Sequence, residues 1–140
     1  MTTPSRDEVD AGATFRERYR RAASDATREL ERLVIGGDFG ANGYTTVEQA
    51  ELLAQRLNLR AGDRLLDLGS GRGWPGIYLA KVTGCSVVLT DIPAEGLVTA
   101  RKRAAVEGLA ERSPAVVSSA RRLPFRPESF EAVVHTDVLC

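Results

Sequence analysis

The chain lacks the features that mark membrane, secreted and nucleic-acid-binding proteins. No apolar run approaches the roughly 20 residues that a membrane-spanning helix needs. The polar start MTTPSRDEVD has no apolar stretch of the kind that a secretion signal carries. Neither sign of charge dominates, because 19 basic side chains balance 19 acidic ones, so there is no field to hold nucleic acid or an anionic membrane. We therefore expect no nucleic acid and no membrane among its partners.

Cysteine and histidine are scarce as well. The two cysteines, Cys85 and Cys140, lack the spacing of a metal or redox motif, so we predict no metal site. Cys85 begins an apolar run and is most simply a small buried side chain. These features favour a reducing, cytoplasmic location. With 140 residues, the chain has room for one domain with a hydrophobic core.

The chain does contain a glycine-rich turn, within residues 65–80, which read LLDLGSGRGWPGIYLA. Leu65, Leu66 and Leu68 are typical of a strand that is buried on both faces, as in a parallel α/β sheet. Three alternating glycines follow, and a helix is predicted from Pro75, which suits the first helical position. Glycine allows positive φ and close approach of a ligand, and the free N–H groups of the helix start face that ligand. The order strand, glycine turn, helix predicts a nucleotide-type binding site.

Two registers of the glycines suggest different nucleotides. Read from Gly71, the pattern G-x-G-x-x-G matches the dinucleotide fingerprint of NAD and FAD proteins. Read from Asp67, the pattern D-x-G-x-G-x-G uses the acid of the strand and all three glycines of the turn. A second apolar run, residues 85–90, ends at Asp91, where a carboxylate is placed to bind ribose hydroxyls. Both NAD and S-adenosylmethionine carry that ribose, so Asp91 predicts an adenosine ligand without separating the two.

Three segments together carry a family resemblance: LLDLGSGRGWPGIYLA, VVLTDIP and SSARRLPFRPESFEAVVHTDVL. From Tyr44 onward the chain resembles the class I S-adenosylmethionine-dependent methyltransferases, notably their small-molecule branch. The resemblance implies an α/β fold with a Rossmann-like open, mainly parallel sheet, S-adenosylmethionine as cofactor and a small-molecule methyl acceptor. The cofactor-binding residues that it implies around the turn and the second strand are Asp67, Gly69, Ser70, Gly71, Gly73, Asp91 and Ile92.

The resemblance also implies a role for each part of this site. The glycine turn would carry the methionine half of the cofactor, Asp67 would orient its amino group, and Asp91 would bind the ribose. The family often has an aspartate just before the position of Ala120, in contact with the adenine amino group. This chain has Ser119 there, so we expect adenine recognition at Ser119 and Ala120 to rely more on backbone groups.

Residues 1–44 are predicted to form an N-terminal helical segment with a glycine-rich loop, ahead of a cofactor-binding half-domain over residues 45–140. Thr14 and Glu17 match a capping box, and apolar residues recur behind it at helical spacing as far as Leu33. This periodicity predicts one helix face.

The loop over residues 35–44, IGGDFGANGY, has two interpretations. It is either a linker between helices or a lid that is hinged on glycines and closes over a ligand. By the family resemblance, Tyr44 and Thr45 would touch the methionine end of the cofactor.

Two more strands are predicted over residues 115–118 and 132–135. The family resemblance implies that the four strands stand in the sheet order 3-2-1-4. The resembling family continues with three further strands, so the fourth strand would be an exposed apolar edge here. We expect a fragment of a longer protein; the alternatives are a naturally shortened chain and a homodimer that pairs this edge. His135 and Asp137 lie at the end of the fourth strand, where open α/β sheets bind ligands. Both are candidate catalytic bases.

Two other functions stay open at this point. A non-catalytic module would bind S-adenosylmethionine and dimerise through residues 132–135 without turnover. An NAD(P)-linked oxidoreductase would explain the glycines and Asp91, but it would leave Asp67 and the stretch LPFRPESF without a role.

Overall fold

The structure is a computed structural model, and it describes residues 3–21 and 23–138. Its elements, in chain order, are α1 (Arg6–Arg20), α2 (Asp25–Val34), α3 (Val47–Leu57), β1 (Arg64–Leu68), α4 (Gly76–Thr83), β2 (Ser86–Asp91), α5 (Ala94–Val106), the 3-10 turn η1 (Ala110–Arg112), β3 (Ala115–Val117) and β4 (Ala132–His135). The strands form one parallel sheet in the order β3-β2-β1-β4. This order confirms the predicted Rossmann-like α/β fold. Within the described ranges, no helix has the length and apolarity that crossing a bilayer requires.

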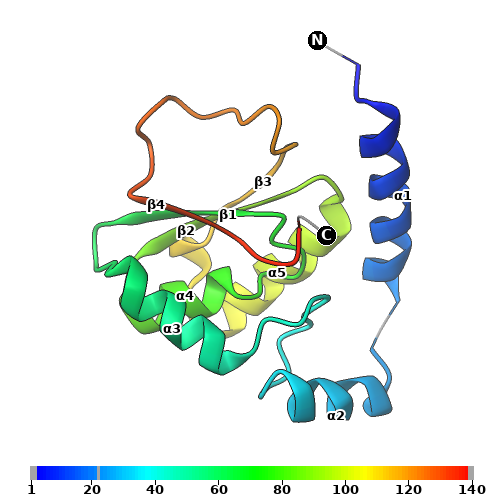
Figure 1. Ribbon diagram of the computed structural model, residues 1–140, viewed down its shortest axis with the longest axis horizontal. Coiled ribbons are helices and arrows are strands. Elements are labelled where there is room, and N and C mark those ends of the chain that lie inside the picture. The colour runs from blue at the N-terminus through cyan, green and yellow to red at the C-terminus, as the bar shows by residue number, and fades with distance from the viewer. Residues whose placement is uncertain (1–2, 22, 139–140) are drawn as a thin grey trace.

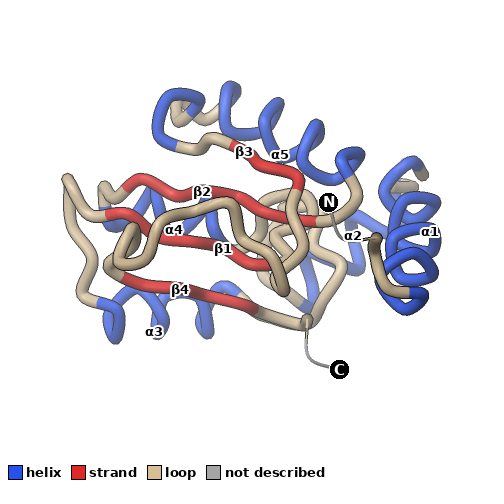
Figure 2. The backbone as a smooth tube through the Cα atoms, turned by 90° about the horizontal axis from the view of Figure 1, so that it is seen from above, coloured by secondary structure: helices blue, strands red, loops and turns tan. Residues whose placement is uncertain are grey.

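The hydrophobic core lies between the central strands and the helices α4 and α5. Leu65 of β1 pairs in register with Val87 of β2, and both side chains are fully buried. Ile77 and Leu79 of α4 pack into the same core cluster. Figures 1 and 2 show α3, α4 and α5 on one face of the sheet, while the loop between β3 and β4 crosses the other face. The apolar runs of the first two strands are buried in this way because the helices and this loop cover them.

The N-terminal helical segment differs from its prediction. The single helix face that was expected behind a cap at Thr14 is wrong, because α1 and α2 are separate helices. Ser5 caps α1: its hydroxyl accepts the N–H of Glu8, whose carboxylate accepts the N–H of Ser5. Thr14 lies inside α1, where its hydroxyl donates to the carbonyl of Asp10 at 3.1 Å. Ser24 caps α2. The sequence contains the capping pattern more than once, and local spacing does not distinguish the copies.

The boundaries next to the glycine turn agree with the predictions to within one residue. The helix α3 begins behind a capping box made by Thr46 and Gln49. Pro75 is the residue before the first helical residue of α4, one position earlier than predicted, and Gly84 ends that helix at φ +82°. The helix α4 follows β1 after the glycine turn, and α5 follows β2 after a short connection. The helix α1 stands beside the carboxyl ends of these strands (Figure 2).

Candidate functional site

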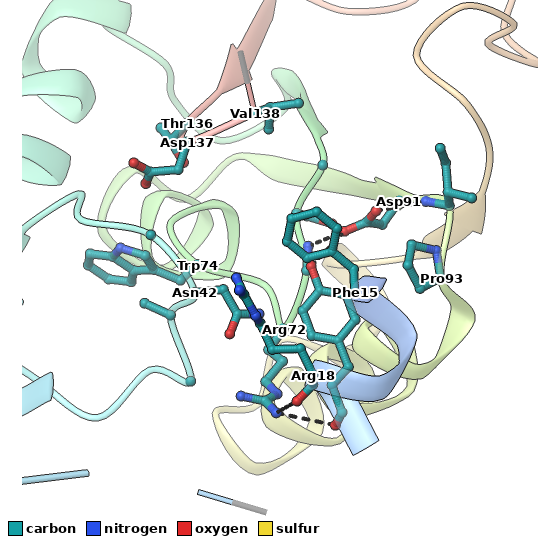
Figure 3. A pocket seen from close by; sticks show the side chains of 18 of the residues that line it. Phe15, Arg18, Asn42, Arg72, Trp74, Asp91, Pro93, Thr136, Asp137 and Val138 are labelled. Atoms are coloured by element: carbon teal, nitrogen blue, oxygen red, sulfur yellow. Dashed lines mark hydrogen bonds between the residues drawn. The ribbon is translucent and has the colours of Figure 1, made fainter. Parts of the chain in front are cut away.

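A cavity of about 560 Å³ opens at the carboxyl ends of β1, β2 and β4. Figure 3 shows its lining from several sides: Asp91 ends β2 and Pro93 follows it, Asp137 and Val138 follow β4, and Trp74 lies opposite. Helix α1 and the loop around residues 40–44 complete the wall. Ligands bind at this edge in open α/β sheets, so the cavity lies where the fold predicts a site.

The cavity separates the predicted site residues into two groups. Those that line it are Tyr44, Gly69, Ser70, Gly71, Asp91, Ile92 and Asp137. Those that do not line it are Thr45, Asp67, Gly73, Ser119, Ala120 and His135. The first group lies at or just after the carboxyl ends of β1, β2 and β4, together with the end of the loop over residues 35–44. Within residues 3–21 and 23–138, no three His, Cys, Asp or Glu side chains gather as a metal site.

The turn after β1 uses the conformation that only glycine adopts without strain. Gly69, Gly71 and Gly73 have φ values of +69°, +52° and +93°. A Cβ at Gly71 would lie 2.9 Å from the hydroxyl oxygen of Tyr19, so a side chain there would also push into the cavity wall. The N–H of Ser70 donates to the carbonyl of Thr90 at 2.9 Å, which ties the turn to β2. The alternating glycines thus leave backbone groups exposed to a ligand.

Asp67 lies beneath the turn and outside the cavity. Its side chain is 1% exposed, and its Oδ2 accepts the N–H of Gly76 at 3.1 Å. Burial raises the pKa of Asp67 well above its ordinary range. That Asp67 orients a ligand's amino group stays a prediction. Asp67 fixes the start of α4 and, through it, the glycine turn.

Asp91 joins the glycine turn to the end of β2. Its Oδ2 accepts the N–H of Gly71 at 2.8 Å and the O–H of Tyr19 at 3.3 Å. Its Oδ1 accepts the N–H of Ile92 at 2.7 Å. Burial raises the pKa of Asp91, while the two backbone donors oppose that rise. A partly buried carboxylate beside a glycine turn is an acceptor site for the hydroxyls of a nucleoside.

The loop over residues 35–44 is held by α2 in its middle and by the site at its end. In its middle, the buried Glu31 carboxylate of α2 accepts the N–H groups of Phe39 and Ala41 at 2.7 and 3.0 Å. At its end, Thr45 donates its hydroxyl to Asp137 Oδ2 at 2.9 Å, and its carbonyl accepts the indole N–H of Trp74 at 2.8 Å. These contacts keep the loop against the cavity; that it opens as a lid stays a prediction.

The two candidate bases differ in position. Asp137 lines the cavity, and its Oδ2 holds both the hydroxyl and the N–H of Thr45. His135 is exposed, is the last residue of β4 and does not line the cavity. The cavity is bordered by the residues that follow the strand, beginning at Thr136, because the chain turns toward the glycine turn only there.

Two cavity residues, Tyr19 and Arg72, were not among the predicted site residues. Tyr19 is buried, and burial together with the nearby charge of Asp91 raises the pKa of its hydroxyl. The Arg72 guanidinium donates to the carbonyls of Arg18, Tyr19 and Arg21, at 3.0–3.2 Å, so the glycine turn holds the end of α1. An aromatic and a cationic residue in these places are common in surface helices and turns, so the sequence carries no signal for these contacts.

We expect Asp67→Asn to change how the stability depends on pH. Because burial raises the pKa of Asp67 in the folded state, the folded chain holds that proton at pH values where the unfolded chain has lost it. The contribution of Asp67 to the free energy of unfolding therefore falls as the pH rises from about 4 through the raised pKa. Asparagine still offers an oxygen to the N–H of Gly76 but does not ionise. Urea unfolding from pH 4 to 8 should show that the free energy of unfolding declines more steeply with pH in the wild type than in Asp67→Asn. Parallel pH profiles of the two chains would contradict this explanation.

The fold and the pairing of Asp91 with Gly71 define a nucleotide-binding α/β domain of the open-sheet class. Residues 65–140 match the family model described as a methyltransferase domain, and the chain belongs to this methyltransferase family.

Among curated relatives, the chain is 35% identical over 138 residues to a 27-O-demethylrifamycin SV methyltransferase from Amycolatopsis mediterranei, a match that covers 95% of this chain and 48% of that protein. A solved S-adenosylmethionine-dependent methyltransferase from Geobacter sulfurreducens, in complex with S-adenosyl-L-homocysteine, is 26% identical, with a TM-score of 0.59 over 66% of this chain and 37% of that one. A geranyl diphosphate methyltransferase, solved with its diphosphate and sinefungin, is 27% identical, with a TM-score of 0.59 over 63% of this chain and 33% of that one. The chain spans about half or less of the length of the curated relatives that it matches.

Proposed function

We propose that this chain is the cofactor-binding part of an enzyme that transfers a methyl group from S-adenosylmethionine to a small molecule. The observation that carries the proposal is the contact of Asp91 with Gly71 at 2.8 Å, inside a cavity of about 560 Å³. The carboxylate offers acceptors for the ribose hydroxyls, and the turn offers backbone without side chains to the methionine half. The volume lies in the range of cavities that hold cofactors.

The relatives support both parts of the proposal. The Geobacter sulfurreducens structure holds S-adenosyl-L-homocysteine, the demethylated form of the cofactor. The Amycolatopsis mediterranei relative is named for a rifamycin substrate, and the geranyl diphosphate methyltransferase binds a small diphosphate. We propose a small-molecule acceptor for this chain on these grounds, together with its balanced charge.

The residues that line the cavity suit this chemistry. When bound, S-adenosylmethionine supplies an electrophilic methyl group on a sulfonium. Asp91 and the glycine turn would fix the two ends of that molecule, and in-line placement contributes much of the acceleration of a methyl transfer. Phe15 and Val138 give the cavity apolar walls that exclude water. Of the two proposed bases, Asp137 lines the cavity and would take a proton from an acceptor bound there, whereas His135 would need to act from outside the cavity.

Calorimetric titration tests the proposal. We expect S-adenosylhomocysteine and S-adenosylmethionine to bind this chain with one site, and NADH to give no heat of binding. Binding of NADH without binding of S-adenosylhomocysteine would overturn the proposal in favour of the oxidoreductase alternative. Cofactor binding without turnover of any acceptor would favour the non-catalytic module.

The proposal extends to a partner and a location. We propose that a second copy of the chain pairs with β4, because among the described strands β4 pairs only with β1 and its Val133 is 52% exposed. We also propose a cytoplasmic location, which suits the free, buried thiol of Cys85.

We expect the wild-type chain to form dimers as its concentration rises, and Val133→Lys to remain monomeric because a charged side chain on an edge strand opposes pairing. Sedimentation velocity over a concentration series measures both. A wild type that stays monomeric throughout, or a variant that dimerises equally, would contradict pairing through this edge.

A further inference from the structure

Helix α1 contacts the residues that are predicted to bind the adenosine half of the cofactor. The hydroxyl of Tyr19 donates to Oδ2 of Asp91 at 3.3 Å, at the predicted ribose site. The hydroxyl of Ser119, at the predicted adenine site, donates to the carboxylate of Glu8, which holds the pKa of Glu8 at about 2. Between these two contacts, Gly12 packs against Ile92. Helix α1 therefore contacts three of the predicted adenosine-binding residues, Asp91, Ile92 and Ser119.

The hydrogen-bond capacity of Asp91 limits what can share this site. A carboxylate offers about four acceptor positions. Three of them are filled, by the N–H groups of Gly71 and Ile92 and by the hydroxyl of Tyr19. A ribose donates two hydroxyls, so one of the three present donors has to leave before both can bind.

The donor that leaves is the hydroxyl of Tyr19. The N–H groups of Gly71 and Ile92 belong to the glycine turn and to the end of β2, and their bonds of 2.8 and 2.7 Å are shorter than the 3.3 Å bond of Tyr19. Moving Tyr19 thus breaks one long hydrogen bond, whereas moving either backbone donor would break the turn.

We infer that Tyr19 acts as a latch, by which we mean that its hydroxyl occupies the acceptor position on Asp91 that a ribose hydroxyl takes when adenosine binds. Adenosine binding therefore displaces the Tyr19 hydroxyl and releases the contact of α1 with Asp91. The inference rests on the proposed function. The end of α1 keeps separate anchors: the Arg72 guanidinium holds its last carbonyls, and Glu95 pairs with Arg16 and Arg20 at 3.3 and 3.1 Å. The exchange therefore loosens α1 at the cavity while its end stays attached to α5.

The test compares two ligands that differ by one hydroxyl. S-adenosylhomocysteine donates two ribose hydroxyls, whereas its 2′-deoxy analogue donates one and fits the acceptor position that Asp91 still has free. Calorimetry should show that Tyr19→Phe lowers the Kd for S-adenosylhomocysteine about five- to tenfold, which is the range for one hydrogen bond. The Kd for the 2′-deoxy analogue should not change. Phenylalanine keeps the ring that packs against Gly96, so the fold is preserved.

A second measurement follows the helix itself in the wild type. Hydrogen exchange of the α1 amides should become faster when S-adenosylhomocysteine binds, and methionine, which has no ribose, should not change it. Equal or weaker binding by Tyr19→Phe would overturn the latch while leaving the proposed function in place, and so would α1 amides that gain protection on binding. Failure of both chains to bind either ligand would overturn the proposed function and the latch together.

Discussion

Asp91→Ala is expected to weaken the binding of S-adenosylhomocysteine by a hundredfold or more. The substitution removes the acceptor for two ribose hydroxyls, and hydrogen bonds to a charged group contribute about 1.5–3 kcal/mol each. It also leaves the N–H of Gly71 without the partner that it has at 2.8 Å, so the turn that would carry the methionine half loses a fixed point. A hundredfold change corresponds to about 2.7 kcal/mol, which the loss of these bonds readily supplies. Calorimetric titration measures the loss directly.

Two further variants test whether the effect of Asp91→Ala comes from the lost charge, from the lost hydrogen bonds or from a change that any lost carboxylate would cause. Asp91→Asn keeps the size of the side chain and one acceptor oxygen, so its affinity should lie between those of the wild type and Asp91→Ala. Glu107→Gln removes a carboxylate that pairs with Lys81 on the surface and lies outside the cavity, so it should bind like the wild type. An Asp91→Ala chain that is folded and binds with wild-type affinity would show that this carboxylate is not the ribose site.

The sequence predicted the glycine turn and the position of Asp91 at the end of the second strand because both signals are local. An apolar run that ends in alternating glycines has few other structures available, and an acid at the end of the next strand must meet that turn in a parallel sheet. The turn and the acid are indeed joined by the bond between Gly71 and Asp91. The short apolar runs predicted the strands themselves, whereas their order in the sheet came from the family resemblance and is confirmed by the structure.

The contacts of α1 could not be predicted in the same way. Tyr19 reaches Asp91 across 72 residues of sequence, and Arg72 reaches the carbonyl of Tyr19 across 53. Such contacts depend on how the helix docks against the sheet, which neither periodicity nor capping patterns report. Asp67 shows a related limit: its spacing from the glycines is a sequence property, but whether its carboxylate points to the cavity or to the N–H of Gly76 depends on packing.

Gly73→Ala should cost about 2–6 kcal/mol of the free energy of unfolding, a large part of the stability of a chain of this size. Gly73 has a φ of +93°, and a non-glycine residue in such a conformation costs about 1–3 kcal/mol. A Cβ there would also lie 2.4 Å from Cδ1 of Ile77 and 3.2 Å from Cβ of Ala100. Overpacking of this kind costs about a further 1–3 kcal/mol. Ile77 is fully buried, so its side chain has no open space into which to move.

Gly62→Ala is the matched control, because it has nearly the same backbone conformation without the crowding. Its φ is +97°, and a Cβ there would meet no atom within 4 Å. Urea unfolding of both variants therefore separates two contributions to the loss of stability. Gly62→Ala measures the cost of a positive φ in a residue other than glycine. The additional loss in Gly73→Ala measures the cost of crowding between the turn and the helices α4 and α5. Equal losses would show that the turn needs only the positive φ at this position. A larger loss for Gly73→Ala, together with weaker binding of S-adenosylhomocysteine, would show that Gly73 supports the site from outside the cavity. Its N–H closes the turn on the carbonyl of Ser70 at 2.7 Å, and its missing side chain leaves room for Ile77 of α4.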